Sequence, residues 1–235
     1  MSSLDTRMVQ RWRLTALMLT AAASFFLIIF LLEKFSIFNR LEAWSMILGY
    51  LGFLLIAVTL LIGPLKQWLP ASWSSHLLRL RRDLGIAGGS AAILHVILVF
   101  IMFERGTKLM IIGQDTRQKD WWQLFIVDYP DGTTFPDFSL TGIANYMGAV
   151  SILIVLMMTL TSSSRAERLL GGAAWKRIHL GNPLLFILVS FHAVIYVGAI
   201  KGSPHTYTDI VWITAVVLLV RLIAFWWTVG RRRRK

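Results

Sequence analysis

The stretch LGIAGGSAAILHVILVFIMF, residues 84–103, indicates the fold class. It runs for twenty residues without Asp, Glu, Lys or Arg, and a helix of about 20 apolar residues spans the hydrocarbon core of a bilayer. Across the 235 residues, 56% are hydrophobic. The sequence therefore predicts an all-α, polytopic membrane protein with one transmembrane domain over residues 1–235. Its six predicted transmembrane helices cover residues 12–32, 44–63, 84–103, 142–161, 180–200 and 210–228.

The placement of basic residues predicts the orientation in the membrane. The chain has 24 Lys and Arg and a net charge of +12. With both ends inside, sixteen of these 24 lie on inner segments and seven on outer ones, and Arg221 lies within the last helix. Because Lys and Arg concentrate on the cytoplasmic side, we predict a multi-pass protein of the cell inner (cytoplasmic) membrane with N and C termini cytoplasmic. The basic tail, residues 231–235, then anchors to lipid headgroups of the bilayer, and no nucleic acid is expected as partner.

The segments between the helices differ in character. Both inner loops contain serines followed by a basic amphipathic turn, which predicts short interfacial helices with serine caps. The outer loop, residues 104–141, is long and hydrophilic and mixes aspartates with aromatic residues. It is either a cap over the helix bundle at the membrane interface or a docking or gating surface. The chain has no cysteine, so any redox function depends on a bound cofactor rather than on thiols or iron–sulfur clusters.

Two histidines lie deep in separate apolar runs, where a polar side chain is a candidate functional group. His95 follows Arg82 by thirteen residues and His192 follows Arg177 by fifteen, which places both roughly 20 Å along their helices. Two imidazoles at one depth could ligate one haem iron from opposite faces, between helices three and five. The alternative is a pair of buried histidines hydrogen-bonded to backbone or to Ser and Thr.

Small residues share a helix face with His95. Gly88 and Ala92 precede it by seven and three residues, so all three lie on one side of the third helix. This face either leaves room for a flat porphyrin or serves close helix–helix contact.

His179 precedes His192 by thirteen residues on the fifth run and therefore faces about 140° away from it on a regular helix. Asn182 and Pro183 predict a helix start or kink between the two, with Asn182 as N-cap. On the third helix, Arg81 and Arg82 occupy the level where a partner for His179 would lie. The sequence does not encode a second bis-histidine haem.

Two segments resemble the ferric-reductase-like transmembrane domain family, and within it the MsrQ-type haem-binding membrane subunits. They are RLRRDLG through His95, and LTS through WKRIH to His192, and the resemblance as a whole covers helices two to five. The resemblance implies that His95 and His192 are metal ligands of a haem b, and that His179 belongs to an inner haem or to a quinone or flavin site. The chain departs from those relatives in the LGNP sequence after His179 and in its longer outer loop, which leaves the redox partner open.

Together these features predict a membrane b-type haem protein that transfers electrons from a cytoplasmic or membrane donor across the bilayer to an outer-side acceptor. The expected donor is a cytoplasmic flavin reductase or quinone, and the expected acceptor is an outer redox protein or membrane complex. His179 and Arg82 would line the inner entry as a second haem or flavin contact. As an oxidoreductase-type subunit it is expected to lack its own nicotinamide or flavin domain. The alternatives are an accessory subunit of a larger complex with a structural or vestigial haem site, a ferric reductase, or a small-solute transporter whose histidines handle protons.

Overall fold

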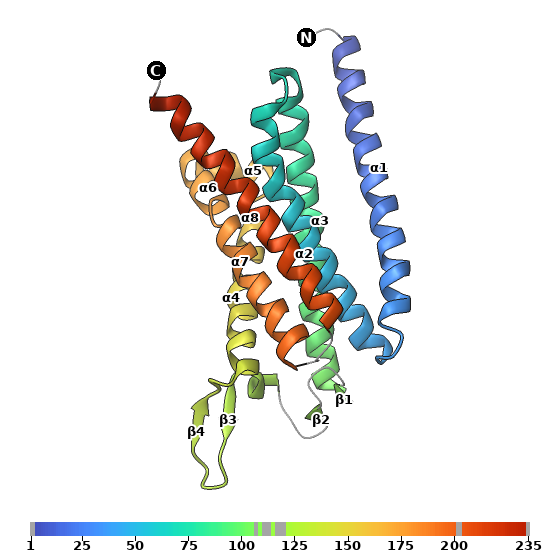
Figure 1. Cartoon of the computed structure of the whole chain (residues 1–235), viewed down its shortest axis with the longest axis vertical. Helices are drawn as coiled ribbons and strands as arrows, with labels where there is room; N and C mark the ends of the chain where they lie inside the picture. The colour runs from blue at the N-terminus through green and yellow to red at the C-terminus, as the bar shows by residue number, and fades with distance from the viewer. Residues whose placement is uncertain (1–2, 106–107, 110–113, 116–120, 201–203, 234–235) are drawn as a thin grey trace.

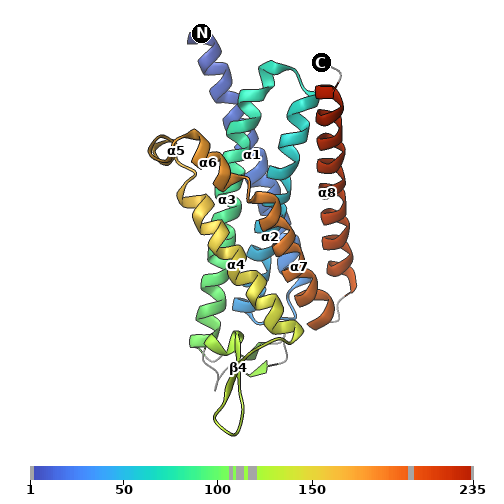
Figure 2. The same cartoon turned by 90° about the vertical axis from the view of Figure 1, so that its left-hand side faces the viewer.

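The structure is a computed structural model that describes residues 3–105, 108–109, 114–115, 121–200 and 204–233. Within these residues, six helical spans are long and apolar enough to cross a membrane. The predicted transmembrane bundle is confirmed, and Figures 1 and 2 show the spans running side by side along the long axis of the molecule. The spans are α1 (Ser3–Lys34), α2 (Arg40–Trp68), α3 (Ala71–Glu104), α4 (Leu140–Leu160), α6 (Gly172–His179) together with α7 (Asn182–Val194), and α8 (Pro204–Arg233).

The two chain ends lie at the same end of the bundle. There α1 begins and α8 ends. The α2–α3 turn lies at this end as well, and the short helix α5 (Ser164–Leu170) lies in the same half of the molecule (Figures 1 and 2). The strands of the loop 104–141 lie at the opposite end (Figure 1). This arrangement agrees with an even number of crossings, and the side of the membrane on which the ends lie stays a prediction.

The prediction of a separate short interfacial helix in the first inner loop is wrong. Helix α2 continues to Trp68 and α3 begins at Ala71, so only Leu69 and Pro70 separate two long helices. Pro70 cannot continue α2 because its ring removes a backbone donor, and it fits the position before the first residue of a new helix. The serine cap predicted for the short helix of the second inner loop is confirmed, because the Ser163 side chain accepts a hydrogen bond from the Ala166 amide at the start of α5.

The predicted break in the fifth span is present. Helix α6 ends at His179 and α7 begins at Asn182, with Pro183 in the first turn of α7. The N-cap is Gly181 rather than Asn182, one residue earlier than predicted. The side chain of Asn182 instead lies buried in the bundle and donates to the Thr59 hydroxyl of α2 at 3.1 Å. This contact fixes the N-terminal end of α7 against α2.

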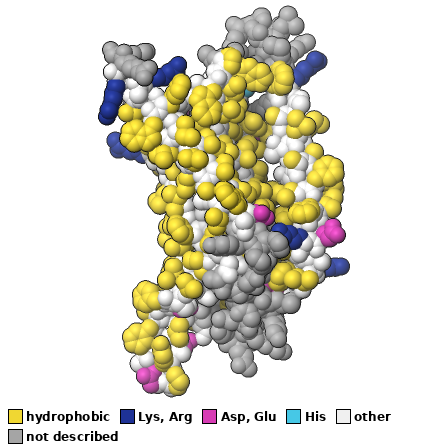
Figure 3. Space-filling view, in the orientation of Figure 1, with side chains coloured by type: hydrophobic (Ala, Val, Ile, Leu, Met, Phe, Trp, Pro, Cys, Tyr) yellow, Lys and Arg dark blue, Asp and Glu magenta, His cyan; other side chains and the backbone are white. Residues whose placement is uncertain are grey.

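The bundle core lies where α2, α4, α7 and α8 meet. Phe53 of α2 and Phe186 of α7 stack there, with ring centres 5.3 Å apart and planes 10° from parallel. Many large apolar side chains of the same helices point outward, and hydrophobic side chains cover the middle of the face in Figure 3. An apolar exterior of this kind is what contact with lipid chains requires.

The loop between α3 and α4 contains β-structure that the all-α prediction omitted. Two short antiparallel pairs form, β1 (Lys108–Leu109) with β2 (Gln114–Asp115), and β3 (Ile126–Asp128) with β4 (Thr134–Pro136). The second pair is closed by a turn in which the Gly132 amide donates to the Tyr129 carbonyl, with Gly132 at a φ of 81° that favours glycine. This β3–β4 hairpin projects away from the helices along the bundle axis (Figures 1 and 2).

Candidate functional site

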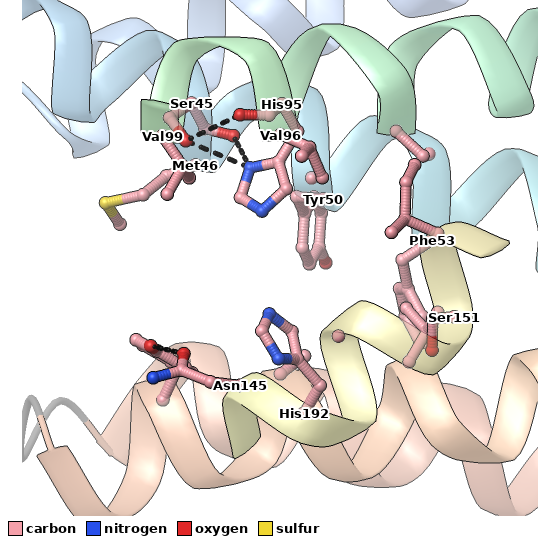
Figure 4. A pocket seen from close by; sticks show the side chains of 18 of the residues that line it. Ser45, Met46, Tyr50, Phe53, His95, Val96, Val99, Asn145, Ser151 and His192 are labelled. Carbon is pink, nitrogen blue, oxygen red and sulfur yellow. Dashed lines mark hydrogen bonds between the residues drawn. The ribbon is translucent and has the colours of Figure 1, made fainter. Parts of the chain in front are cut away.

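A cavity of about 320 Å³ lies between α2, α3, α4 and α7. Its volume is in the range of cofactor and ligand sites. Most of its lining side chains are apolar or aromatic, and His95 and His192 face each other across it (Figure 4). The structure therefore brings the two predicted histidines to one site.

A backbone carbonyl fixes the His95 ring. Its Nδ1 lies 2.7 Å from the carbonyl oxygen of Ser45 on α2, and 3.0 Å from the Ser45 hydroxyl. A carbonyl oxygen can only accept, so Nδ1 carries the proton and donates it. The lone pair of Nε2 is then available, and Figure 4 shows this side of the ring turned toward the cavity.

The same arrangement holds His192 on the opposite wall. Its Nδ1 donates to the carbonyl oxygen of Ala144 on α4 at 2.7 Å. Histidines that ligate metals typically donate their second ring N–H to a carbonyl or carboxylate, which fixes the tautomer and the ring orientation. Both imidazoles are thus held in the form and direction that a ligand needs.

Two glycines give these rings their space. A Cβ atom at Gly49 would lie 3.2 Å from His95 Nδ1, and a Cβ atom at Gly148 would lie 3.0 Å from His192 Nδ1 and Cε1. Gly49 follows Ser45 by four residues on α2, and Gly148 follows Ala144 by four residues on α4. In each pair, the glycine therefore lies on the same helix face as the residue whose carbonyl accepts from the ring. Each histidine ring is thus held by a backbone carbonyl and given space by a glycine one helical turn later.

The separation of the rings fits one shared iron. Their centres are 6.5 Å apart. Taking a metal–imidazole bond of roughly 2 Å and about 1.2 Å from nitrogen to ring centre, two axial imidazoles have centres about 6.4 Å apart. Among the described residues, no group of three His, Asp or Glu side chains could hold a bare metal ion. A pair of histidines in an apolar cavity suits a metal whose other ligands come from a macrocycle, as in haem.

Comparison with known proteins identifies the family of the chain. Residues 48–190, well over half of the chain, match the family described as ferric reductase like transmembrane component. The chain belongs to this family. The matched range includes His95, both glycines and His179, and it ends two residues before His192.

Two curated relatives are similar over most of this chain. It is 28% identical over 167 residues to the protein-methionine-sulfoxide reductase heme-binding subunit MsrQ of Azospira oryzae. The aligned residues cover 71% of this chain and 54% of that protein. It is 23% identical over 183 residues to the magnetosome protein MamZ of Magnetospirillum gryphiswaldense. The aligned residues cover 78% of this chain and 23% of that protein. The chain thus spans about half and about a quarter of the lengths of these relatives.

Gly88 and Ala92, the small residues that share a predicted helix face with His95, lie in different environments. Ala92 lines the cavity, as the sequence predicts. Gly88 is not among the lining residues, because it faces α2, where a Cβ atom would lie 3.1 Å from Leu55 Cβ. Gly52 of α2 approaches it so closely that a Cβ atom there would lie 3.2 Å from the Gly88 carbonyl oxygen. Gly88 therefore serves the close crossing of α2 and α3, the second of the two interpretations left open.

The predicted inner residues lie apart from the cavity. His179 packs on Trp175 of the same helix, with ring centres 4.2 Å apart, and its Nε2 lies 3.4 Å from the Thr161 hydroxyl. Arg82 is exposed on α3. Neither residue lines the cavity. Any role for them concerns a separate inner position.

Sequence reasoning missed a polar cluster next to His192, on the side of the loop 104–141. The Tyr196 ring packs against His192 with centres 4.9 Å apart, and its hydroxyl donates to the Asn145 side-chain oxygen. The Asn145 amide donates in turn to the Leu124 carbonyl at 2.7 Å. Tyr196 follows His192 by four residues, at the start of the π-helical turn η3 (Ile195–Ile200), a feature common at functional sites. The signal available in the sequence was a tyrosine one turn after a buried histidine.

A buried carboxylate also reaches the cavity. Glu42 in the first turn of α2 lines it with only 1% of its surface exposed. The Asn39 side chain accepts from the Glu42 amide at 2.9 Å and donates to the Glu42 carboxylate at 3.3 Å, the reciprocal pairing of a helix cap. The capping residues therefore place one acidic side chain at the edge of a largely apolar cavity.

Proposed function

We propose that His95 and His192 are the axial ligands of one haem b and that the chain conducts electrons through the membrane. The observation that carries this proposal is the pair of Nδ1–H donors bonded to backbone carbonyls, which leaves both Nε2 atoms to bind iron across 6.5 Å between ring centres. A bound haem would supply a one-electron iron couple at this position. The chain supplies the ligands, fixes their tautomers and surrounds the site with apolar side chains.

We infer that electrons enter from the cytoplasmic side and leave toward the outer side. Support comes from the excess of basic residues on the segments predicted to be inner. It also comes from Leu124 and Phe125, which belong to the loop at the other end of the bundle and line the cavity. The haem would therefore lie close to an acceptor that binds at the outer end. The related MsrQ protein is named a heme-binding subunit of a reductase, and we propose a similar partnership here.

For the donor we propose a cytoplasmic flavin reductase or a membrane quinone. The inner end of the bundle carries Arg79, Arg82, Lys176 and Arg177, which would attract an acidic flavoprotein. His179, stacked on Trp175, and Arg82 form the proposed inner contact for a flavin or a second haem. At the level of α3 where an opposite ligand for His179 would lie, the sequence has Arg81 and Arg82 instead of a histidine, so a haem there would have one protein ligand.

A ferric reductase is the second candidate function, because the family that the chain belongs to is described by that activity. It would share the same haem site and the same direction and would differ only in the outer acceptor, a ferric complex instead of a protein. An accessory subunit with a structural haem is the remaining alternative.

A reduced-minus-oxidised absorption spectrum of the purified chain tests the proposal. We expect the sharp bands of a low-spin b-type haem. A chain without haem after expression with ample haem supply would overturn the proposal and favour a transporter. Rapid reoxidation of the reduced haem by ferric chelates would favour the ferric reductase, whereas slow reoxidation would favour transfer to a protein acceptor.

A further inference from the structure

The outer segment that follows the β1–β2 pair is attached directly to the wall of the cavity. It comprises η2 (Trp121–Leu124) and the β3–β4 hairpin. The Asn145 amide holds the Leu124 carbonyl, and the Tyr146 hydroxyl donates to the Phe125 carbonyl. Because Leu124 and Phe125 also line the cavity, this segment is an extension of the site and not a separate surface loop.

The hairpin continues outward from this attachment. The Asp137 amide donates to the Phe125 carbonyl at 2.8 Å, which closes the base of the hairpin against the cavity wall. From there the two strands extend along the bundle axis beyond the helix ends (Figures 1 and 2). This direction takes the hairpin away from the lipid-facing sides of the helices and into the space where a soluble protein would approach.

The hairpin is acidic in a strongly basic chain. Residues 121–139 hold Asp128, Asp131 and Asp137 and no Lys or Arg, although the chain has a net charge of +12. The basic residues of the loop 104–141 all precede Trp121 in the sequence. Hydrogen bonds from the Thr133 hydroxyl and amide lower the pKa of Asp131. Asp131 is therefore ionised at neutral pH, and the turn carries a fixed negative charge.

Aromatic side chains lie exposed beside these charges. Tyr129 and Phe135 form an edge-to-face pair with ring centres 5.8 Å apart, and Phe138 is 76% exposed. On the face shown in Figure 3, the projecting hairpin shows hydrophobic and acidic side chains. Exposed aromatic residues with a charged rim are the usual composition of a protein–protein contact surface.

A short aromatic route joins this surface to the cavity. Phe100 lines the cavity, and Trp121 packs edge-on against it with ring centres 5.7 Å apart. Trp122 follows at 6.2 Å from Trp121, and both tryptophans are about half exposed. A partner seated on the hairpin and on η2 would therefore lie within two side chains of the cavity lining.

We propose that residues 121–139, which comprise the Trp121–Leu124 turn, the β3–β4 hairpin and the residues that follow it, are the docking surface for a soluble redox protein with a basic patch around its own cofactor. This inference rests on the proposed function, because it specifies the acceptor of that electron transfer. With a haem held by His95 and His192, each encounter would transfer one electron: the haem would be oxidised by one electron and the partner's cofactor reduced by one electron. No atom or proton is transferred. Charge attraction speeds the encounter, and the exposed aromatic residues provide the contact area.

The test uses the full chain in lipid nanodiscs and cytochrome c, a small basic redox protein, as the probe. Binding is measured by surface immobilisation at low and at physiological salt. Asp128→Asn together with Asp131→Asn removes two charges while keeping oxygen acceptors for Gln123 and Thr133. We expect affinity for the probe to fall about threefold or more at low salt, with a weaker salt dependence. The matched control, Glu33→Gln with Asp209→Asn, removes two exposed acids at the same end of the bundle and should bind like wild type.

A second variant examines the aromatic contact. Phe138→Ala leaves the charges in place and should also weaken binding of the probe. Equal binding by the hairpin variants and wild type, or an equal loss in the control, would overturn the proposal. Quenching by lipid-borne quenchers of a fluorophore attached to Thr134→Cys, which would be the single cysteine of the given sequence, would overturn it too, because the hairpin would then face the bilayer.

The binding assay does not depend on haem, so it separates the two proposals. A hairpin that binds the probe in a chain without haem would contradict the proposed function alone. A chain with a normal haem spectrum whose hairpin variants bind like wild type would contradict the docking surface alone.

Discussion

The imidazole planes of His95 and His192 cross at 78°, with ring centres 6.5 Å apart. Each ring takes its orientation from a different helix pair. His95 on α3 is set by the Ser45 carbonyl of α2, and His192 on α7 is set by the Ala144 carbonyl of α4. The angle between the rings therefore depends on how these two helix pairs pack, and substitutions in either pair should change the site in measurable ways.

Loss of either ring should abolish the axial pair. We expect His95→Ala and His192→Ala each to remove the low-spin absorption bands of the proposed haem, because one remaining imidazole leaves the iron five-coordinate. His76→Ala changes a histidine of α3 that does not line the cavity and should leave the spectrum intact. Unchanged spectra in both cavity mutants would falsify the assignment of ligands.

The crossing angle itself predicts a spectroscopic property. Perpendicular axial imidazoles leave the two iron orbitals that interact with the ligand planes nearly equal in energy. The oxidised chain should therefore give a highly anisotropic low-spin electron paramagnetic resonance signal rather than the rhombic signal of parallel rings. A rhombic signal from the intact wild-type protein would mean that the rings rotate when iron binds, against the carbonyl bonds at 2.7 Å.

Gly148 should tolerate no side chain. In Gly148→Ala the new Cβ atom would lie 3.0 Å from His192 Nδ1 and Cε1, so the ring has to shift from its carbonyl partner. Overpacking of this kind costs about 1–3 kcal/mol, and disturbed outer partners lower metal affinity roughly 10- to 100-fold. Haem titration of the detergent-solubilised variant measures this loss. Gly63→Ala is the matched control, because a Cβ atom there meets nothing within 4 Å; a similar loss in both variants would indicate a general helix effect.

The sequence was sufficient for the transmembrane spans and for placing the two histidines at one level of the bundle, because both depend on local signals. An apolar run of about 20 residues predicts a membrane helix by itself, and depth along a helix follows from counting residues between His95 and Arg82. The break before Pro183 was predictable for the same reason, since proline acts on its own backbone and the preceding turn.

The residues that seat the rings were not predictable in this way. Gly49 and Gly148 lie on other helices than the histidines they accommodate, so their role depends on the rotation of α2 against α3 and of α4 against α7. The same ambiguity explains Gly88, whose small size could serve either a porphyrin or a neighbouring helix until the α2–α3 crossing was known. The hairpin was missed because its strands are three residues long, too short for an alternating pattern.

Asn145 should couple the outer segment to His192. Asn145→Ala removes two hydrogen bonds, one to the Leu124 carbonyl and one from the Tyr196 hydroxyl. Buried side-chain hydrogen bonds in membrane proteins contribute about 0.6 kcal/mol each on average, so we expect a loss near 1 kcal/mol. Limited proteolysis of the outer segment should become faster, and the absorption bands of the haem proposed to bind His192 should shift. Tyr196→Phe loses only one of the two bonds and should show a smaller change in proteolysis; an equal change would place the effect at Tyr196 instead.

His179 tests the direction of electron flow. Its ring stacks on Trp175 and lies near the Thr161 hydroxyl, outside the cavity, so the His95 and His192 pair does not depend on it. We expect His179→Ala to leave the main haem spectrum intact and to slow reduction by a cytoplasmic-side flavin reductase, because the proposed inner contact is lost. Stopped-flow reduction of inside-out vesicles measures the rate, and dithionite, which needs no docking site, serves as the control reductant. Normal reduction by the reductase would show that electrons enter elsewhere. Loss of the main haem would instead assign His179 a structural role at the α6–α7 break beside Pro183.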